Sequence, residues 1–276
     1  MPEGPEIRLA ADKLARAIAG RPLVRVYFKF DALKPYESTL AASQITHFET
    51  RGKALLTHFA CGLTVYSHNQ LYGIWRVIKT GAPQIGKRDL RLAIETKTKT
   101  AQLFSASDIE VMDTALVAQH RFIRGLGPDV LASTLTTDML AQRLALPRFS
   151  GKSVASLLLD QGFLAGMGNY LRSEVLFEAQ IAPRAAPKSL TDQAKLRLAT
   201  ALIDVPLRSY KSKGVTNLRA LRNEKAIVKR GHREYETYRF AIFDRAGLPC
   251  YECAERIERI EIGSRRLFFC PSCQAQ

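Results

Sequence analysis

The sequence predicts an α+β protein of several domains, and three observations carry that prediction. Within the first 125 residues, a strictly alternating stretch and several further short strand candidates are separated by turns. Beyond residue 125 apolar residues recur at helical spacing. Near the carboxyl end, four cysteines fall in two close pairs. We therefore expect a strand-rich domain over residues 1–125, an α-helical domain over 126–237 and a cysteine hairpin over 238–276.

In the first domain, one helix precedes the strands. Apolar residues recur at helical spacing between Glu3 and Ala19, and Gly20 to Pro22 ends that pattern. The stretch "LVRVYFKF" then alternates, which places Val24, Val26, Phe28 and Phe30 on one face of a strand. Further strands are predicted over residues 45–49, 54–59, 63–67, 73–78, 90–96 and 102–105. Short strands separated by turns are typical of a β-sandwich or barrel.

The second domain is expected to be helical and to end in a basic connector. Helical spacing covers residues 137–146, 152–159, 170–179 and 191–204. Residues 209–233 are strongly basic with little periodicity, which predicts a mobile or partly helical connector. From Tyr238 the chain alternates again and predicts a strand that leads into the cysteine hairpin.

The charge balance favours a polyanionic partner. The 276 residues include 41 Lys+Arg against 26 Asp+Glu, a formal net charge of +15. Such an excess is expected of a nucleic-acid-binding protein, although a generally basic protein or one that touches anionic lipid would share it. No apolar run is long enough to span a bilayer, and no export signal opens the chain. We expect a cytoplasmic protein with a nucleic-acid partner and without a membrane partner.

The four carboxyl-terminal cysteines predict a metal site. Cys250 and Cys253 are separated by two residues, as are Cys270 and Cys273, with sixteen residues between the pairs. This spacing lets two tight turns present four thiolates to one tetrahedral Zn²⁺, which would be structural because no coordination position stays open. Two disulfides are the alternative, and a reducing compartment disfavours them. The fifth cysteine, Cys61, is expected to be a small buried apolar residue.

The opening "MPEGPEI" has a chemical and a structural interpretation. Removal of Met1 would leave Pro2 with a terminal secondary amine, of which roughly 10% is unprotonated at pH 7 against about 0.04% of a lysine. Such an amine can attack a sugar C1′ and form an iminium, which makes strand cleavage by elimination possible. Glu3 beside it could act as a general acid or base. Alternatively, Pro-Glu simply begins a helix.

Two later stretches could bind phosphate. In "LLLDQGFLAGMGNYLRSEVLF", glycines interrupt the helical pattern and Asn169 is placed to cap the next helix, whose first N–H groups could meet a phosphate. In "GSRRLFFC", Arg265 and Arg266 lie on the hairpin between the cysteine pairs, where a fixed guanidinium could grip a phosphate. An ordinary helix connection and a solvated turn are the respective alternatives.

In this order along one chain, these features resemble the formamidopyrimidine-DNA glycosylase and endonuclease VIII family. The resemblance covers essentially the whole chain, and "PEGPEI" and "NQLYG" are most similar to the endonuclease VIII branch. It also rests on "TRGKALLTHF", "YSHNQLYGIWRV", "SASDIE", "GPDVL", "LLLDQGFLAGMGNYLRSE" and the cysteine hairpin. The fold it implies is a helix with a β-sandwich, a helix-two-turn-helix domain and a zinc-finger hairpin.

The resemblance also implies four catalytic residues. Pro2 matches the Schiff-base nucleophile and Glu3 the proton donor beside it. Lys53, at the "TRGKA" turn, matches the lysine that assists β-elimination, and Arg265 matches the arginine of δ-elimination.

For DNA binding, the resemblance implies a loop and a phosphate ligand. Gln70, Leu71 and Tyr72 match residues that enter the duplex when the damaged nucleotide leaves it, and Asn169 matches a phosphate-binding asparagine. Relatives carry a DNA-contacting arginine at the position of Gly125, whereas here Arg124 lies one place earlier. The basic connector is also longer than in relatives.

The function expected from the sequence is therefore a monomeric, bifunctional DNA glycosylase and AP lyase of base excision repair. It would act on oxidised pyrimidines in damaged double-stranded DNA, with one structural Zn²⁺. A purine-directed enzyme of the same family, and a zinc-ribbon protein that binds damaged DNA without catalysis, are the alternatives.

Overall fold

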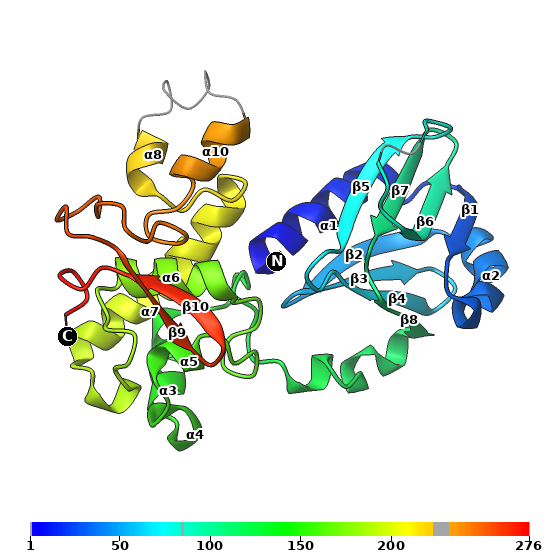
Figure 1. Ribbon diagram of the computed structural model, residues 1–276. Helices are drawn as coiled ribbons and strands as arrows, with labels where there is room; N and C mark the ends of the chain where they lie inside the picture. The colour runs from blue at the N-terminus through cyan, green and yellow to red at the C-terminus, as the bar shows by residue number, and fades with distance from the viewer. Residues whose placement is uncertain (1, 84–85, 223–231, 276) are drawn as a thin grey trace. The chain divides into compact units, whose positions relative to one another are not determined.

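The computed structural model describes residues 2–83, 86–222 and 232–275. Two compact units divide the chain, Met1–Gly125 and Leu126–Gln276 (Figure 1). The residues after 238 fall within the second unit together with the helices, so a separate third domain stays a prediction. No helix in the described part of the chain is both long and apolar enough to cross a membrane.

The first unit is a sandwich of two antiparallel sheets covered by one helix. The first sheet has the order β1 (Leu23–Phe28), β6 (Leu90–Thr96), β7 (Lys99–Phe104) and β5 (Ile74–Lys79). The second has the order β2 (Ile45–Arg51), β3 (Ala54–Phe59), β4 (Leu63–His68) and β8 (Asp108–Asp113). Helix α1 (Gly4–Ile18) shares one apolar core with both sheets, and the predicted β-sandwich is confirmed. Smaller elements are η1 (Asp31–Tyr36), α2 (Glu37–Ala41), η2 (Thr114–Gln119) and η3 (Ile123–Gly125).

Two expectations for this unit were wrong. Val26 and Phe28 are buried as the alternation predicts, but Val24 is 58% exposed. A bulge between Leu23 and Arg25 shifts the register of β1 and turns Val24 outward. Strand β8 was not predicted: acidic residues occupy three of its six positions, and pairing with β4 holds it in the sheet.

The second unit joins helices to a two-stranded hairpin. The helices are α3 (Thr137–Ala145), α4 (Pro147–Ser150), α5 (Val154–Leu157), α6 (Asn169–Glu178), η4 (Pro187–Ser189), α7 (Asp192–Lys211), α8 (Leu218–Arg222) and α10 (His232–Tyr238). The hairpin consists of β9 (Glu258–Ile262) and β10 (Arg265–Phe269). Leu267 of β10 is buried in the same core as α3, α6 and α7.

The helix bounds differ most around residues 191–233. Helix α7 continues past Asp204 through Pro206 to Lys211, because Val205 and Pro206 are buried and their packing offsets the unfavourable proline. The predicted connector therefore begins inside α7 and includes α8, and its residues 223–231 lie outside the described residues. The helix expected over 152–159 is shorter, as α5.

Candidate active site and nucleic-acid interface

The amino end is fixed by the first turn of α1. Glu3 is the N-cap residue of that helix and is only 3% exposed. The carboxylate of Glu6 accepts a hydrogen bond of 3.0 Å from the backbone N–H of Glu3, within a capping box. Pro-Glu thus begins a helix, as the structural interpretation predicts. This observation does not test whether Pro2 is also a nucleophile. A rigid helix start holds Pro2 at a defined place immediately before Glu3.

Lys53 lies at the tip of the β2–β3 hairpin. Gly52 and Lys53 form a two-residue turn between the paired residues Arg51 and Ala54. Gly52 has φ +61°, which suits a glycine at the first central position of a hairpin turn. Helix α1 packs against both β2 and β3 in the same unit. Joint action of Lys53 with Pro2 stays a prediction.

The "NQLYG" loop joins β4 to β5 and has a tightly defined main chain. The Gly73 N–H donates to the carbonyl of Asn69 at 2.7 Å, and a Cβ on Gly73 would lie 2.4 Å from that oxygen. Gln70 adopts φ +52°, and its Oε1 accepts from the hydroxyl of Ser107 at 2.8 Å. Any side chain at position 73 would therefore force this loop to move.

The side chains of the same loop face solvent. Leu71 is 55% exposed and Tyr72 is 72% exposed, which is unusual for large apolar residues. The carbonyl of Tyr72 accepts a hydrogen bond of 2.7 Å from Arg88 Nη1. The loop combines a fixed backbone with free apolar side chains, as insertion into a duplex would require.

His68 supports this loop, and the sequence analysis did not identify it. Its Nδ1 lies 3.2 Å from the backbone N–H of Gln70, which donates to it. Burial lowers the pKa of His68, and the nearby positive charge of Lys53 lowers it further against the opposite effect of Asp108. The neutral ring can therefore act as the acceptor at pH 7.

Arg124 lies in η3 at the end of the first unit and is exposed. Space around Gly125 is open, because a Cβ built there meets nothing within 4 Å. Packing therefore does not explain the glycine at this position, where the family resemblance implies an arginine. Whether Arg124 contacts DNA stays a prediction.

Asn169 begins α6 but does not cap it. The N-cap is Gly168, so the predicted capping role was wrong. The Nδ2 of Asn169 instead donates to the carbonyl of Arg266 at 2.7 Å, and its Oδ1 accepts from Arg172 Nη2 at 2.6 Å. These contacts tie the first turn of α6 to strand β10 of the hairpin, which is distant in sequence.

Arg172 is a second residue that the sequence analysis missed. It is fully buried, and Nη2 donates to the carbonyl of Arg266 at 3.0 Å. A longer contact of 3.4 Å reaches the carbonyl of Arg265. A single arginine within the apolar stretch of α6 was the available signal, because a buried guanidinium must satisfy its donors.

Arg265 and Arg266 open strand β10 after a tight turn. Gly263 and Ser264 have φ +60° and +58°, which is the geometry of a type I′ hairpin turn. Both arginines are exposed, and the guanidinium of Arg172 donates hydrogen bonds to their backbone carbonyl groups. The hairpin therefore presents two cations on a supported backbone.

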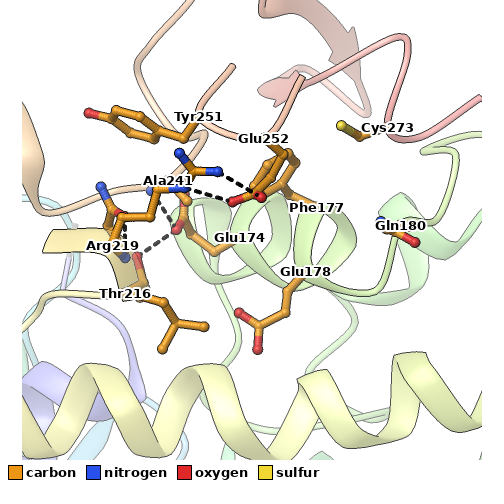
Figure 2. A pocket seen from close by; sticks show the side chains of 12 residues that line it. Glu174, Phe177, Glu178, Gln180, Thr216, Arg219, Ala241, Tyr251, Glu252 and Cys273 are labelled. Atoms are coloured by element: carbon orange, nitrogen blue, oxygen red, sulfur yellow. Dashed lines mark hydrogen bonds and ion pairs between the residues drawn. The ribbon is translucent and has the colours of Figure 1, made fainter. Parts of the chain in front are cut away.

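Glu174 explains why residues 238–250 do not form the expected strand. Its Oε1 accepts from the backbone N–H groups of Ile242 and Phe243, each at 2.8 Å. Its Oε2 accepts from Ala241 N at 2.9 Å and from the Thr216 hydroxyl at 2.6 Å (Figure 2). These backbone donors are satisfied by one buried carboxylate from α6, so they need no neighbouring strand.

A cavity of about 240 Å³ lies beside this carboxylate in the second unit (Figure 2). Residues of α6, the 216–219 segment and the cysteine-bearing loops line it. Its charged side chains are already paired: Arg219 with Glu252 at 3.0 Å, and Arg208 with Glu178 at 2.6 Å. The cavity contains none of the predicted catalytic or DNA-binding residues.

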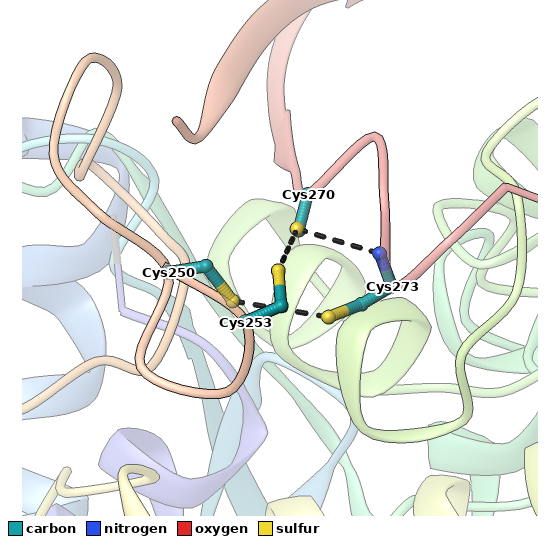
Figure 3. Close-up of side chains that lie close together, drawn as sticks. All are labelled: Cys250, Cys253, Cys270 and Cys273. Atoms are coloured by element: carbon teal, nitrogen blue, oxygen red, sulfur yellow. Dashed lines mark hydrogen bonds between the residues drawn. The ribbon is translucent and has the colours of Figure 1, made fainter. Parts of the chain in front are cut away.

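Figure 3 shows the four cysteines of the hairpin as one cluster. The Sγ atoms are 3.9 Å apart for Cys250 and Cys273, and 3.4 Å apart for Cys253 and Cys270. A disulfide needs about 2.05 Å, so the disulfide alternative was wrong. A tetrahedral ion with Zn–S bonds of 2.3 Å would separate its sulfurs by about 3.8 Å. The donor set and its spacing fit such an ion.

Cys61 differs from expectation, since it is exposed. It lies in the turn between β3 and β4, where its backbone N–H donates to the hydroxyl of Ser43 at 3.0 Å.

Comparison with known families matches both units. The N-terminal domain of formamidopyrimidine-DNA glycosylase matches residues 1–109, and its H2TH domain matches residues 126–218. Together with the sandwich, the helical turn and the cysteine hairpin, these matches define a class of DNA glycosylases that carry a helix-two-turn-helix domain.

The curated relatives specify the family within that class. An endonuclease 8 of Pectobacterium atrosepticum is 45% identical over 275 residues, covering 100% of both chains. Endonuclease 8 of Escherichia coli strain K12 is 46% identical over 274 residues, covering 99% of this chain and 100% of the relative. The chain belongs to the formamidopyrimidine-DNA glycosylase and endonuclease 8 family.

Solved structures share the fold. Lactococcus lactis Fpg (MutM), crystallised with DNA that contains an oxidised pyrimidine, has a TM-score of 0.82 and 22% identity over 100% of both chains. The same Lactococcus protein with abasic-site DNA has a TM-score of 0.81, covering 99% of this chain and 100% of that chain. At this identity the likeness concerns the fold alone.

Proposed function

We propose that this protein removes oxidised pyrimidines from double-stranded DNA and nicks the strand through an imine on Pro2. Family membership makes the chain a DNA glycosylase and AP lyase of base excision repair. The observation that supports the finer proposal is the amino end, where Pro2 directly precedes the buried Glu3 and Glu3 forms a capping box with Glu6.

The proposed chemistry starts once Met1 has been removed. The Pro2 nitrogen attacks C1′ of the lesion nucleotide, and the base leaves with a proton supplied by Glu3. Opening of the C1′–O4′ bond, with a proton transferred to O4′, then gives the iminium. The iminium accepts the electron pair released when the C2′ proton is lost, and the resulting enamine expels the 3′ phosphate by breaking the C3′–O bond. A second elimination breaks the C5′–O bond. We assign assistance in the first elimination to Lys53 and in the second to Arg265.

Contact with DNA is proposed for both units. Gln70, Leu71 and Tyr72 would fill the space of the extruded nucleotide, which offsets part of the few kcal/mol that flipping costs. Asn169 and Arg265 would meet phosphates, and Arg124 is a further candidate contact. If about six phosphates are neutralised, log K should fall with log[salt] with a slope near −5.

We further propose that Cys250, Cys253, Cys270 and Cys273 hold one structural Zn²⁺. A bound divalent ion would hold the four cysteines as thiolates and cross-link the two turns of the hairpin. Removal by a chelator should release one zinc per chain and expose β10 to proteolysis. The protein is proposed to act as a monomer on nucleoid DNA in the bacterial cytoplasm.

The decisive experiment is borohydride trapping on a duplex that contains thymine glycol. We expect a covalent DNA adduct on Pro2 in a chain that lacks Met1, identified by mass spectrometry. Glu3→Gln should lose base release yet still trap a preformed abasic site, because the amine remains. Glu95→Gln is the matched control: it removes a carboxylate from β6 of the same unit, outside the capping box, and should keep both activities.

Two results would contradict this function. Tight DNA binding without an adduct on either thymine glycol or an abasic site would favour the non-catalytic damage-binding alternative. Faster release of 8-oxoguanine than of thymine glycol would instead identify a purine-directed enzyme.

A further inference from the structure

The outer face of the β2–β3 hairpin carries two histidines and a carboxylate that no step above uses. His47 on β2 is the register partner of His58 on β3, and Glu49 lies two residues along β2 on the same face. Their potential ligand atoms all lie within 4.8 Å of one another. His47 is exposed and His58 is buried, so one side of the cluster is packed within the unit and the other is accessible to solvent.

Hydrogen bonds orient both imidazoles in the same way. Thr64 Oγ1 lies 2.8 Å from Nδ1 of His58, and that hydroxyl is itself 2.8 Å from the hydroxyl of Thr114. Thr46 Oγ1 lies 3.1 Å from Nδ1 of His47. A hydroxyl on Nδ1 leaves Nε2 as the coordinating atom of each ring, and in His58 a metal would replace the hydrogen bond that Nε2 now shares with Glu49.

The separations suit a small cation. Nε2 of His58 lies 3.3 Å from Oε2 of Glu49. Two ligands at about 2.0–2.1 Å in a tetrahedral zinc site are about 3.3 Å apart. The two rings stack with centroids 4.3 Å apart and planes inclined by 13°, and the exposed His47 can tilt to complete the site. Oε1 of Glu49 is held by Arg51 Nε at 2.7 Å, which leaves Oε2 for the metal.

We propose that His47, Glu49 and His58 bind one divalent transition-metal ion of the zinc type, distinct from the four-cysteine site. Two imidazoles with one carboxylate favour Zn²⁺, Cu²⁺ or Ni²⁺ over Mg²⁺ and Ca²⁺, which prefer oxygen ligands. The fourth position faces solvent and is filled by water. A metal here joins β2 to β3 beside the turn that carries Lys53.

The test uses tag-free, full-length protein whose cysteine site is already loaded with zinc. Isothermal titration with Zn²⁺ should show one further equivalent, and His47→Ala and Glu49→Gln should each abolish saturable binding. Thr64→Val should weaken it about tenfold, because the ring of His58 loses its orienting partner. Arg51→Gln should strengthen it by removing a competing cation from Glu49. Bound Cu²⁺ should show two coupled nitrogens in its electron paramagnetic resonance spectrum.

Glu95→Gln is the matched control, because it removes a carboxylate from another strand of the same unit and should leave Zn²⁺ binding unchanged. His47 is exposed, so its replacement is not expected to unfold the sheet. Absence of a further equivalent, or equal Zn²⁺ affinity in the wild type and His47→Ala, would overturn the proposal and leave a His58–Glu49 hydrogen bond without a metal.

Discussion

The loop over residues 69–73 and the hairpin at Arg265 are both expected to contact DNA, yet they are held in opposite ways. In the loop, the main chain is fixed by local hydrogen bonds and the apolar side chains of Leu71 and Tyr72 are free. In the hairpin, the buried guanidinium of Arg172 and the side-chain amide of Asn169, both on α6, hold the main chain through the carbonyl of Arg266. Substitutions in the loop should therefore change function with little effect on stability. Substitutions of the α6 residues that support the hairpin should change both function and stability.

The largest stability effect is expected at Glu174. Replacement by Gln removes the charge that binds three backbone N–H groups and a hydroxyl, and should lower the free energy of unfolding by about 3 kcal/mol or more. Urea unfolding measures this loss. Glu258→Gln, an exposed carboxylate on β9, serves as the control and should stay within about 0.5 kcal/mol of the wild type. An equally small effect at Glu174 would show that these four hydrogen bonds do not stabilise the second unit.

Arg172→Met should come next, with a loss of about 2 kcal/mol, since the hydrogen bonds of a buried guanidinium to carbonyl oxygens disappear. The δ-elimination product should also decline, because the backbone of Arg265 loses support. Gel analysis of the nicked ends follows that product. Arg184→Met removes an exposed arginine from the same unit and should alter neither quantity.

Changes in the loop should be smaller in stability and selective in function. Ser107→Ala removes the hydrogen bond to Gln70 and should cost about 1 kcal/mol or less. Leu71→Ala should change the free energy of unfolding by less than about 0.5 kcal/mol, because the side chain is mostly exposed, while it slows thymine glycol release. A large stability loss in Leu71→Ala would show that the side chain supports the fold.

The smallest expected effect is a change in the pH dependence of stability, caused by His68 next to the loop. The folded-state pKa of His68 lies below its ordinary value near 6.5, so the unfolded chain binds the proton first. Stability from this residue is complete above about pH 6.5 and declines as the pH falls below it. Wild type compared with His68→Asn, by thermal unfolding between pH 7.5 and 5, should show a steeper loss in the wild type. Parallel curves would remove His68 as the cause.

Features set by local sequence were predictable, and those set by distant partners were not. The four cysteines cluster as their spacing requires, and β3 and β6 have their predicted bounds. The alternation after Tyr238 was misleading because the acceptor for residues 241–243 is Glu174, 67 to 69 positions earlier. Asn169 likewise bonds to Arg266, 97 positions later, and not to its own helix. Such long-range hydrogen-bond partners leave no periodic signal in the local sequence.

Glu174 has a consequence for how the segment that follows α7 can vary in length. Thr216 and Ala241 bond to the same carboxylate oxygen, and the backbone N–H of Thr216 donates to the carbonyl of Arg239 at 2.8 Å. The segment between Thr216 and Ala241 thus has both of its ends held at Glu174. Doubling the length of such a loop costs only about 0.6 kcal/mol. A change in the length of this segment should therefore cost little stability and leave the contacts of Glu174 with Thr216 and Ala241 in place.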